Sequence, residues 1–257
     1  MLLTPLEQFQ IISIFPINFF CLDFSVTNLV FINFIILLLI SFVFYFISSE
    51  SYGGIKGSFF FIPGVWQTFF EMVYEMVVQL VYDNLNSEGE KYLPYISTLF
   101  VFILFNNLIG LVPYSFTVTS HIIVTFTLSI SIFIGVVIIG CQKHKFQMLS
   151  IFLPANTSFF LALLLVPIEV ISYIFKPISL GVRLFANLMA GHTLLKVIVG
   201  FSWSLLMLED ILSLLHVVPL LILVLLMGLE LGVALIQAYV FIVLTCIYLN
   251  DSINLSH

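Results

Sequence analysis

Residues 205–249 read LLMLEDILSLLHVVPLLILVLLMGLELGVALIQAYVFIVLTCIYL, a run of 45 residues with no proline after Pro219. As one α-helix this run would be about 67 Å long, more than twice the roughly 30 Å of hydrocarbon in a bilayer. No polar turn divides it, because only Gly228 and Gly232 flank its central charged residue, Glu230. The run therefore predicts a membrane helix that is strongly tilted or is broken into two spans.

A second apolar run of similar length comes just before the first. It contains Pro154, Pro167 and Pro177, and prolines of this kind can kink a helix. We predict that the two runs form a pair of long, tilted, antiparallel helices, at residues 152–201 and 205–250.

The rest of the chain also has the composition of an integral membrane protein, with 62% hydrophobic and 8% charged residues. A membrane β-barrel would show roughly 10-residue segments of alternating hydrophobicity. The sequence lacks them, so the spans are predicted to be helices. After an N-terminal arm (residues 1–25), upright spanning helices are predicted at residues 26–48, 95–113 and 122–141. The predicted fold class is an all-α integral membrane protein with a single membrane domain, residues 1–257.

Residues 64–86 are predicted to lie along the membrane interface. Polar residues recur every four positions from Glu71 to Asp83, with apolar residues between them, which indicates an amphipathic helix. If this helix does not cross, zero or two crossings separate the four lysines between the first span and the long helices, so these four share one side. These lysines are Lys56, Lys91, Lys143 and Lys145. The positive-inside rule makes that side the cytoplasm or matrix and puts the N-terminal arm outside.

Two polar stripes with a seven-residue spacing run along the long helices. Their members are Glu169, Lys176 and Arg183 on the first helix, and Glu209, His216, Glu230 and Gln237 on the second. Arg183 is the only arginine of the chain, and its guanidinium stays protonated at every cellular pH. A fixed charge at membrane depth indicates a functional site and needs a partner.

An antiparallel hairpin folded near residue 210 predicts a proton route in two halves. Carboxylates and imidazole can take up and release protons near neutral pH when their surroundings tune them. Arginine cannot release its proton, so it interrupts the route. Protons must therefore pass the arginine on a mobile carboxylate of another protein. Three chemically sensible pairs imply this one fold-point: Arg183 with Gln237, His192 with Glu230, and Glu169 with Asp251.

Other polar residues also admit a structural interpretation. Lys176 can snorkel to the interface, and His192 and His216 can be core histidines with structural partners. The helix-packing alternative applies to His121, Asn106 and Asn107. The cysteines lack metal or disulfide spacing, so no metal or cofactor is predicted. The net charge of −6 is spread thinly and predicts no nucleic-acid partner.

Two other functions fit the sequence less well. A haem protein would need pairs of axial histidines, which five scattered histidines do not supply. A secondary transporter would usually show internal repeats with broken helices.

Four stretches resemble subunit a of the rotary ATP synthases, most of all its mitochondrial form. They are TPLEQF, NLIGLVPYSFTVTSH, SLGVRLFANLMAGH and ELGVALIQAYVFIVLTCIYLND. The resemblance implies a non-catalytic, proton-translocating stator subunit that couples proton flow to rotation and ATP synthesis. In that family, Arg183 would be the essential arginine between two offset half-channels, and it would meet the carboxylates of a rotating ring of c subunits.

The resemblance also implies roles for the other site residues. His192 and Glu230 match the half-channel on the intermembrane-space side. Asn187 and Gln237 match polar neighbours of the arginine, and the matrix half-channel is matched by Glu169 and Asp251. Further implied partners are the peripheral-stalk and other membrane subunits and the lipid bilayer. The implied location is the mitochondrial inner membrane, with the N-terminus towards the intermembrane space and the C-terminus towards the matrix. A sodium-driven form of the same motor stays open.

Overall fold

The computed structural model describes residues 9–19, 22–50, 64–112, 115–145, 159–207 and 215–254. Within these ranges the chain forms six α-helices and several short elements. The helices are α1 (Asn28–Glu50), α2 (Val65–Leu85), α3 (Leu93–Gly110), α4 (Ile122–His144), α5 (Phe159–Leu206) and α6 (Val217–Ile253). Two short 3₁₀ helices, η2 (Asn86–Tyr92) and η3 (Val118–Ser120), precede α3 and α4.

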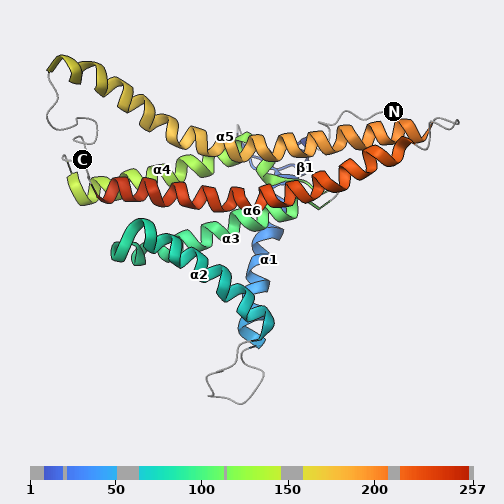
Figure 1. Ribbon diagram of the computed structural model, residues 1–257, viewed down its shortest axis with the longest axis horizontal. Coiled ribbons are helices and arrows are strands. Elements are labelled where there is room, and N and C mark those ends of the chain that lie inside the picture. The colour runs from blue at the N-terminus through green and yellow to red at the C-terminus, as the bar shows by residue number, and fades with distance from the viewer. Residues whose placement is uncertain are drawn as a thin grey trace.

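The two longest helices, α5 and α6, run side by side along the long axis of the molecule (Figure 1). Helix α4 packs against both of them, and α3 packs against α6 and α2. Helix α1 runs across the direction of the α5–α6 pair and contacts α3. Large apolar side chains remain exposed on both long helices, among them Leu163, Phe175, Val197, Leu220 and Leu225. This surface is suited to lipid or to another membrane protein.

Five helical segments of the described chain are long and apolar enough to cross a membrane, and α2 is not among them. This confirms the predicted all-α integral membrane class. The apolar face of α2 is buried in the protein, at Val77, Leu80, Val81 and Leu85, while the polar stripe from Glu71 to Asp83 is exposed. Its position in the membrane interface stays a prediction.

The first long helix ends later than the predicted residue 201 and the second begins later than the predicted residue 205, while the gap between them contains the predicted fold-point near residue 210. Helix α5 continues to Leu206, and α6 begins only at Val217; residues 208–214 lie outside the described ranges. The stretch from Phe201 to Leu206 contains no glycine or proline to end the helix. Pro219 stands in the first turn of α6, where its missing N–H needs no helical acceptor and its fixed φ suits the helix.

Helix α5 is bent in its N-terminal part, which Figure 1 draws in yellow. Pro167 and Pro177 lie inside this part of the helix. Each proline removes one backbone donor, and its ring pushes against the carbonyl of the preceding turn. The predicted kinks are therefore found in a helix that stays continuous through Pro167 and Pro177; Pro154 lies outside the described ranges.

Helices α4 and α5 cross closely just before Arg183 on α5. A Cβ atom placed on Gly181 would lie 2.6 Å from Ser129 Oγ and 3.0 Å from the carbonyl oxygen of Thr125. Small residues allow membrane helices to approach this closely. Gly181 stands two residues before Arg183, so this contact fixes the position of the segment that carries the arginine.

The N-terminal arm contains short strands that the sequence did not predict. β1 (Ser13–Phe15) pairs antiparallel with β4 (Val26–Thr27), and β2 (Asn18–Phe19) pairs with β3 (Leu22–Asp23). Asn28 ties this arm to the start of α1, because its side chain accepts from the Ile12 N–H at 3.2 Å and donates to the Gln10 carbonyl at 3.0 Å. The first span therefore begins at Asn28, two residues later than predicted.

Candidate functional site

The polar residues of α5 lie on one continuous helix and contact α6 at three levels. Lys176 Nζ lies 3.0 Å from Asp251 Oδ2, and the Asn187 side-chain amide donates to Gln237 Oε1 at 3.0 Å. Further along α5, the backbone at Gly191 lies against the carboxyl group of Glu230. Residue numbers rise along α5 while those of the partners fall along α6, so the two helices are antiparallel.

Two of the three predicted pairs are displaced. Asp251 pairs with Lys176, seven residues beyond the predicted Glu169, and Gln237 pairs with Asn187, four residues beyond the predicted Arg183. The prediction assumed two straight helices with one common turn near residue 210. The first assumption fails, because α5 is bent in the part that contains Pro167 and Pro177. The second holds, since residue 210 lies in the gap between α5 and α6.

The third predicted pair is brought together. His192 and Glu230 line the same cavity between α5 and α6, which has a volume of about 240 Å³. Its walls are mostly apolar, and its other polar side chain comes from Asn187. Leu111, the residue just after α3, also lines it. The cavity therefore exposes a carboxyl group, an imidazole and an amide to one small space.

Two polar residues that the sequence did not assign to the site, Thr117 and Asn107, contact segments that line or flank the cavity. A Cβ atom placed on Gly110 would lie 3.0 Å from Thr117 Cγ2 and 4.0 Å from His192 Nε2, so Thr117 and His192 flank the end of α3. Asn107, one turn before Gly110, donates to the Ala234 carbonyl at 3.3 Å. Ala234 lies one turn after Glu230 on α6. These residues come from segments distant in sequence, and only the paired asparagines inside a span hinted at them.

Several buried polar atoms of α3, of the segment before α4 and of His192 have no hydrogen-bond partner within the described ranges. They are His192 Nε2, Asn107 Oδ1, Thr117 Oγ1, Thr119 Oγ1 and His121 Nε2. A buried polar atom left unpaired costs about 1–3 kcal/mol, and such groups commonly bind ordered water. The His121 ring stacks on Phe116 with a centroid distance of 5.0 Å, and burial lowers the pKa of its imidazole.

Arg183 lies on α5 between the Lys176–Asp251 pair and the Asn187–Gln237 hydrogen bond. Its side chain is exposed on the protein surface. Among the described residues, no carboxylate forms an ion pair with its guanidinium. The permanent charge is thus presented outwards, on a helix whose surface is otherwise largely apolar.

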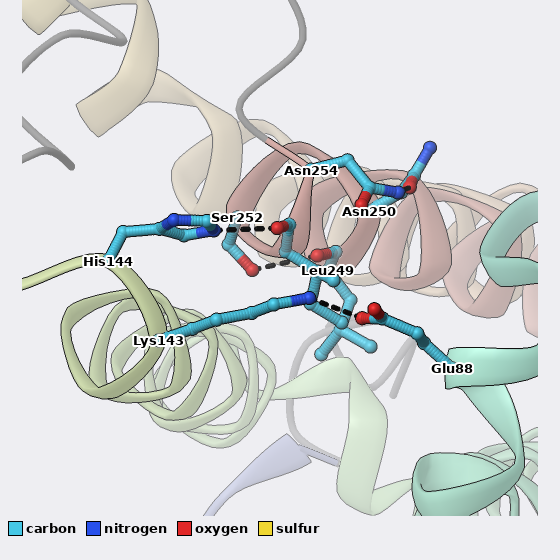
Figure 2. A network of polar contacts seen from close by, with 8 residues as sticks. Glu88, Lys143, His144, Leu249, Asn250, Ser252 and Asn254 are labelled. Atoms are coloured by element: carbon cyan, nitrogen blue, oxygen red, sulfur yellow. Dashed lines mark hydrogen bonds and ion pairs between the residues drawn. The ribbon is translucent and has the colours of Figure 1, made fainter.

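One end of the molecule gathers the C-termini of α4 and α6 with η2, as Figure 2 shows. Lys143 forms an ion pair with Glu88 of η2, and His144 Nε2 lies 2.6 Å from the Ile253 carbonyl oxygen. Lys91 belongs to η2 as well. Three of the lysines predicted to share one side, Lys91, Lys143 and Lys145, therefore lie at this end or next to it, and Lys56 lies outside the described ranges.

These features define a class: a multi-pass helical membrane protein with ionisable groups along the contact of its two longest helices. A sequence model of the family described as "ATP synthase A chain" matches residues 29–250, and the chain belongs to this family, whose members are components of the proton-translocating ATP synthase complex.

Relatives named ATP synthase subunit a align along nearly the whole chain. The protein of Pylaiella littoralis is 50% identical over 252 residues, which cover 98% of each chain. The protein of Marchantia polymorpha is 48% identical over 255 residues, again covering 98% of each. The protein of Chondrus crispus is 47% identical over 252 residues, covering 98% of this chain and 96% of its own. The family thereby supports a role in ATP synthesis and proton transport.

Proposed function

We propose that this chain is the stator subunit through which protons pass on their way to and from a rotating ring of c subunits. The observation that carries the proposal is the position of Arg183. Its charge is exposed on a largely apolar helix and forms no ion pair with a carboxylate in the described parts of its own chain. Because an uncompensated charge at membrane depth is costly, a carboxylate of another membrane subunit is the fitting partner.

The entry half-channel of the proposal is the cavity that His192 and Glu230 share. Imidazole and carboxyl groups can take up and release protons when their surroundings tune them. The unpaired Oγ1 of Thr117, a residue that flanks the end of α3 together with His192, supports a hydrated approach to this pair. Asn187 of α5 lines this cavity and is hydrogen-bonded to Gln237 of α6. This hydrogen bond lies between the His192–Glu230 pair and Arg183.

The exit half-channel of the proposal lies towards the other end of the hairpin, at Asp251 and Glu169. Lys176 contacts Asp251, and Glu169 lies two turns before Lys176 on α5. Arg183 stands between this region and the entry cavity. Since arginine does not release its proton, a proton can cross that point only on the ring carboxylate.

Rotation follows from the cost of charge in lipid. A ring carboxylate neutralised at the entry cavity can turn into the bilayer, whereas an ionised one pays several kcal/mol or more to do so. After nearly a full turn it reaches the exit region and releases its proton, and Arg183 then stabilises the ionised form. Each charge that crosses contributes about 2.3 kcal/mol per 100 mV of membrane potential. The chain itself carries out no covalent step in this scheme.

We further propose a location in the mitochondrial inner membrane, in contact with peripheral-stalk and other membrane subunits. The lysine-bearing end (Lys91, Lys143 and Lys145) would face the matrix by the positive-inside rule. The C-terminal turn of α6 lies at that end, so the C-terminus would face the matrix. The N-terminus would face the intermembrane space.

Replacing Arg183 by alanine tests the proposal. We expect the assembled complex in reconstituted vesicles to lose ATP synthesis driven by a proton gradient, and lysine to restore little, because its compact, strongly hydrated charge differs from a guanidinium. Lys145→Ala, which removes a positive charge at the exposed end of α4, is the matched control. Normal synthesis by Arg183→Ala would refute the assignment. Synthesis that requires Na⁺ would identify the sodium-driven form.

A further inference from the structure

The carboxyl group of Glu230 occupies the space that a side chain at position 191 would fill. A Cβ atom placed on Gly191 would lie 2.5 Å from Glu230 Oε1, 3.1 Å from Cδ and 3.4 Å from Cγ. Carbon and oxygen atoms that are not bonded to each other do not approach to 2.5 Å without displacement. The present position of the carboxyl group therefore requires glycine at residue 191.

No hydrogen bond or ion pair among the described residues holds the Glu230 carboxyl group. What surrounds it is the wall of the shared cavity, including the α5 backbone at Gly191 and the side chain of His192, the next residue along. Because α5 carries both of these residues, contact with Gly191 sets where the carboxyl group lies relative to the imidazole. Gly191 acts sterically on the position of the carboxyl group, because its missing side chain leaves room for Glu230 Oε1.

The displaced group would be the end of a flexible side chain. At Gly181, by contrast, a Cβ atom would meet backbone atoms of α4. A methyl group at position 191 can therefore be accommodated by a different rotamer of Glu230, without separating α5 from α6. Substitution here should move the carboxyl group and leave the helical hairpin in place.

We propose that Gly191 is a positioning residue for proton entry: its missing side chain lets the Glu230 carboxyl group lie against α5 beside His192. The inference rests on the proposed function of the His192–Glu230 cavity. Gly191 itself exchanges no proton. It acts through Glu230, and its replacement should affect the reaction only while a full-length glutamate stands at position 230.

The experiment measures proton translocation by the assembled complex in vesicles, at fixed membrane potential and over a range of external pH. We expect Gly191→Ala to slow translocation by up to about a hundredfold, because misplacing a reacting group by about 1 Å can cost that much. Gly200→Ala is the matched control on the same helix, because no atom lies within 4 Å of a Cβ placed there. This control should keep the wild-type rate.

A shorter acid at position 230 provides the decisive comparison. Glu230→Asp withdraws the carboxyl group by one methylene, away from a methyl group on residue 191. We expect Gly191→Ala to cause little further loss when it is added to Glu230→Asp, although it slows the glutamate form strongly. Equal losses in the two backgrounds, or a wild-type rate for Gly191→Ala, would overturn the positioning role.

Two further variants distinguish failure of the positioning role from loss of assembly and from failure of the proposed function. If Gly191→Ala prevents assembly, Glu230→Asp should restore assembly; a double variant that also fails to assemble would refute the steric account. Glu230→Gln tests the proposed function itself. A wild-type rate in Glu230→Gln would remove the role of the cavity, whereas a slow Glu230→Gln with a normal Gly191→Ala would remove only the positioning role.

Discussion

The ammonium group of Lys176 lies 3.0 Å from Oδ2 of Asp251, which joins the bent part of α5 to the last turns of α6. The rings of Tyr173 and Tyr248 flank the ammonium at 5.5 and 5.1 Å, within the range of cation–π attraction. Both charged side chains are partly exposed, at 30% and 47%. Partly exposed ion pairs contribute at most about 1 kcal/mol to stability, so this contact matters more for placing Asp251 than for folding.

Lys176→Met should therefore leave the complex assembled and slow proton release, because Asp251 loses the group that places it. Lys176→Arg should retain most of the rate, since a guanidinium can also bind the carboxylate and stack on the tyrosines. The measurement is proton-driven ATP synthesis in vesicles, with assembly checked by native gel electrophoresis. Wild-type synthesis in the methionine variant would show that Lys176 only extends to the membrane interface.

The register of the hairpin can be tested with cysteine pairs. Asn187→Cys with Gln237→Cys should react readily with a short bifunctional thiol reagent, because the native side chains are in hydrogen-bond contact. Arg183→Cys with Gln237→Cys, one turn away, is the comparison and should react less. The native cysteines (Cys21, Cys141 and Cys246) are first replaced by alanine. A stronger yield from the Arg183 pair would restore the register that the sequence alone suggested.

Hydropathy and length are enough to predict most of this fold. The apolar runs predicted the five helices that are long enough to cross a membrane. The four-residue spacing of polar residues in α2 predicted that this helix is amphipathic. These signals are local, since each reflects how one segment partitions between water and lipid. The strands around Asn18 were missed because two or three residues give no periodic pattern, and their hydrogen bonds depend on how the arm folds back.

The site was only partly predictable, for a related reason. Residue spacing places Glu169, Lys176 and Arg183 on one stripe, but spacing alone assumes straight helices. In the bent α5, Asp251 and Gln237 have other partners than predicted, while His192 and Glu230 still share a cavity. The roles of Gly191 and Thr117 depend on close approach between segments distant in sequence. No property of these residues in isolation distinguishes them from other small or polar residues in a membrane helix.

The α4–α5 crossing provides a stability test. Gly181→Ala should destabilise the complex by about 1–3 kcal/mol, as expected for overpacking, because the new Cβ would meet the Thr125 carbonyl oxygen and the Phe126 Cα as well as Ser129 Oγ. Gly135→Ala on α4, where a Cβ has open space, should have little effect. Thermal inactivation of the purified complex provides the comparison, and equal inactivation of the two variants would contradict the close crossing.

Proton entry should need one acid and one imidazole at positions 192 and 230, and should depend less on which position carries which group. Alanine at His192 or at Glu230 removes one proton-handling group and leaves its partner in a largely apolar cavity, so each change should slow proton entry. The exchange His192→Glu with Glu230→His keeps one acid and one imidazole at the same depth. We expect it to retain more activity than either alanine variant.

The same vesicle measurement, taken at fixed membrane potential over a range of external pH, compares the exchange with the two single losses. Gly191 bears on the outcome, because histidine at position 230 must fit the space that the carboxyl group now occupies. If both alanine variants run at the wild-type rate at every pH, His192 and Glu230 are structural. Proton entry would then have to be sought at His121, whose Nε2 is buried without a partner among the described residues, and at His216 next.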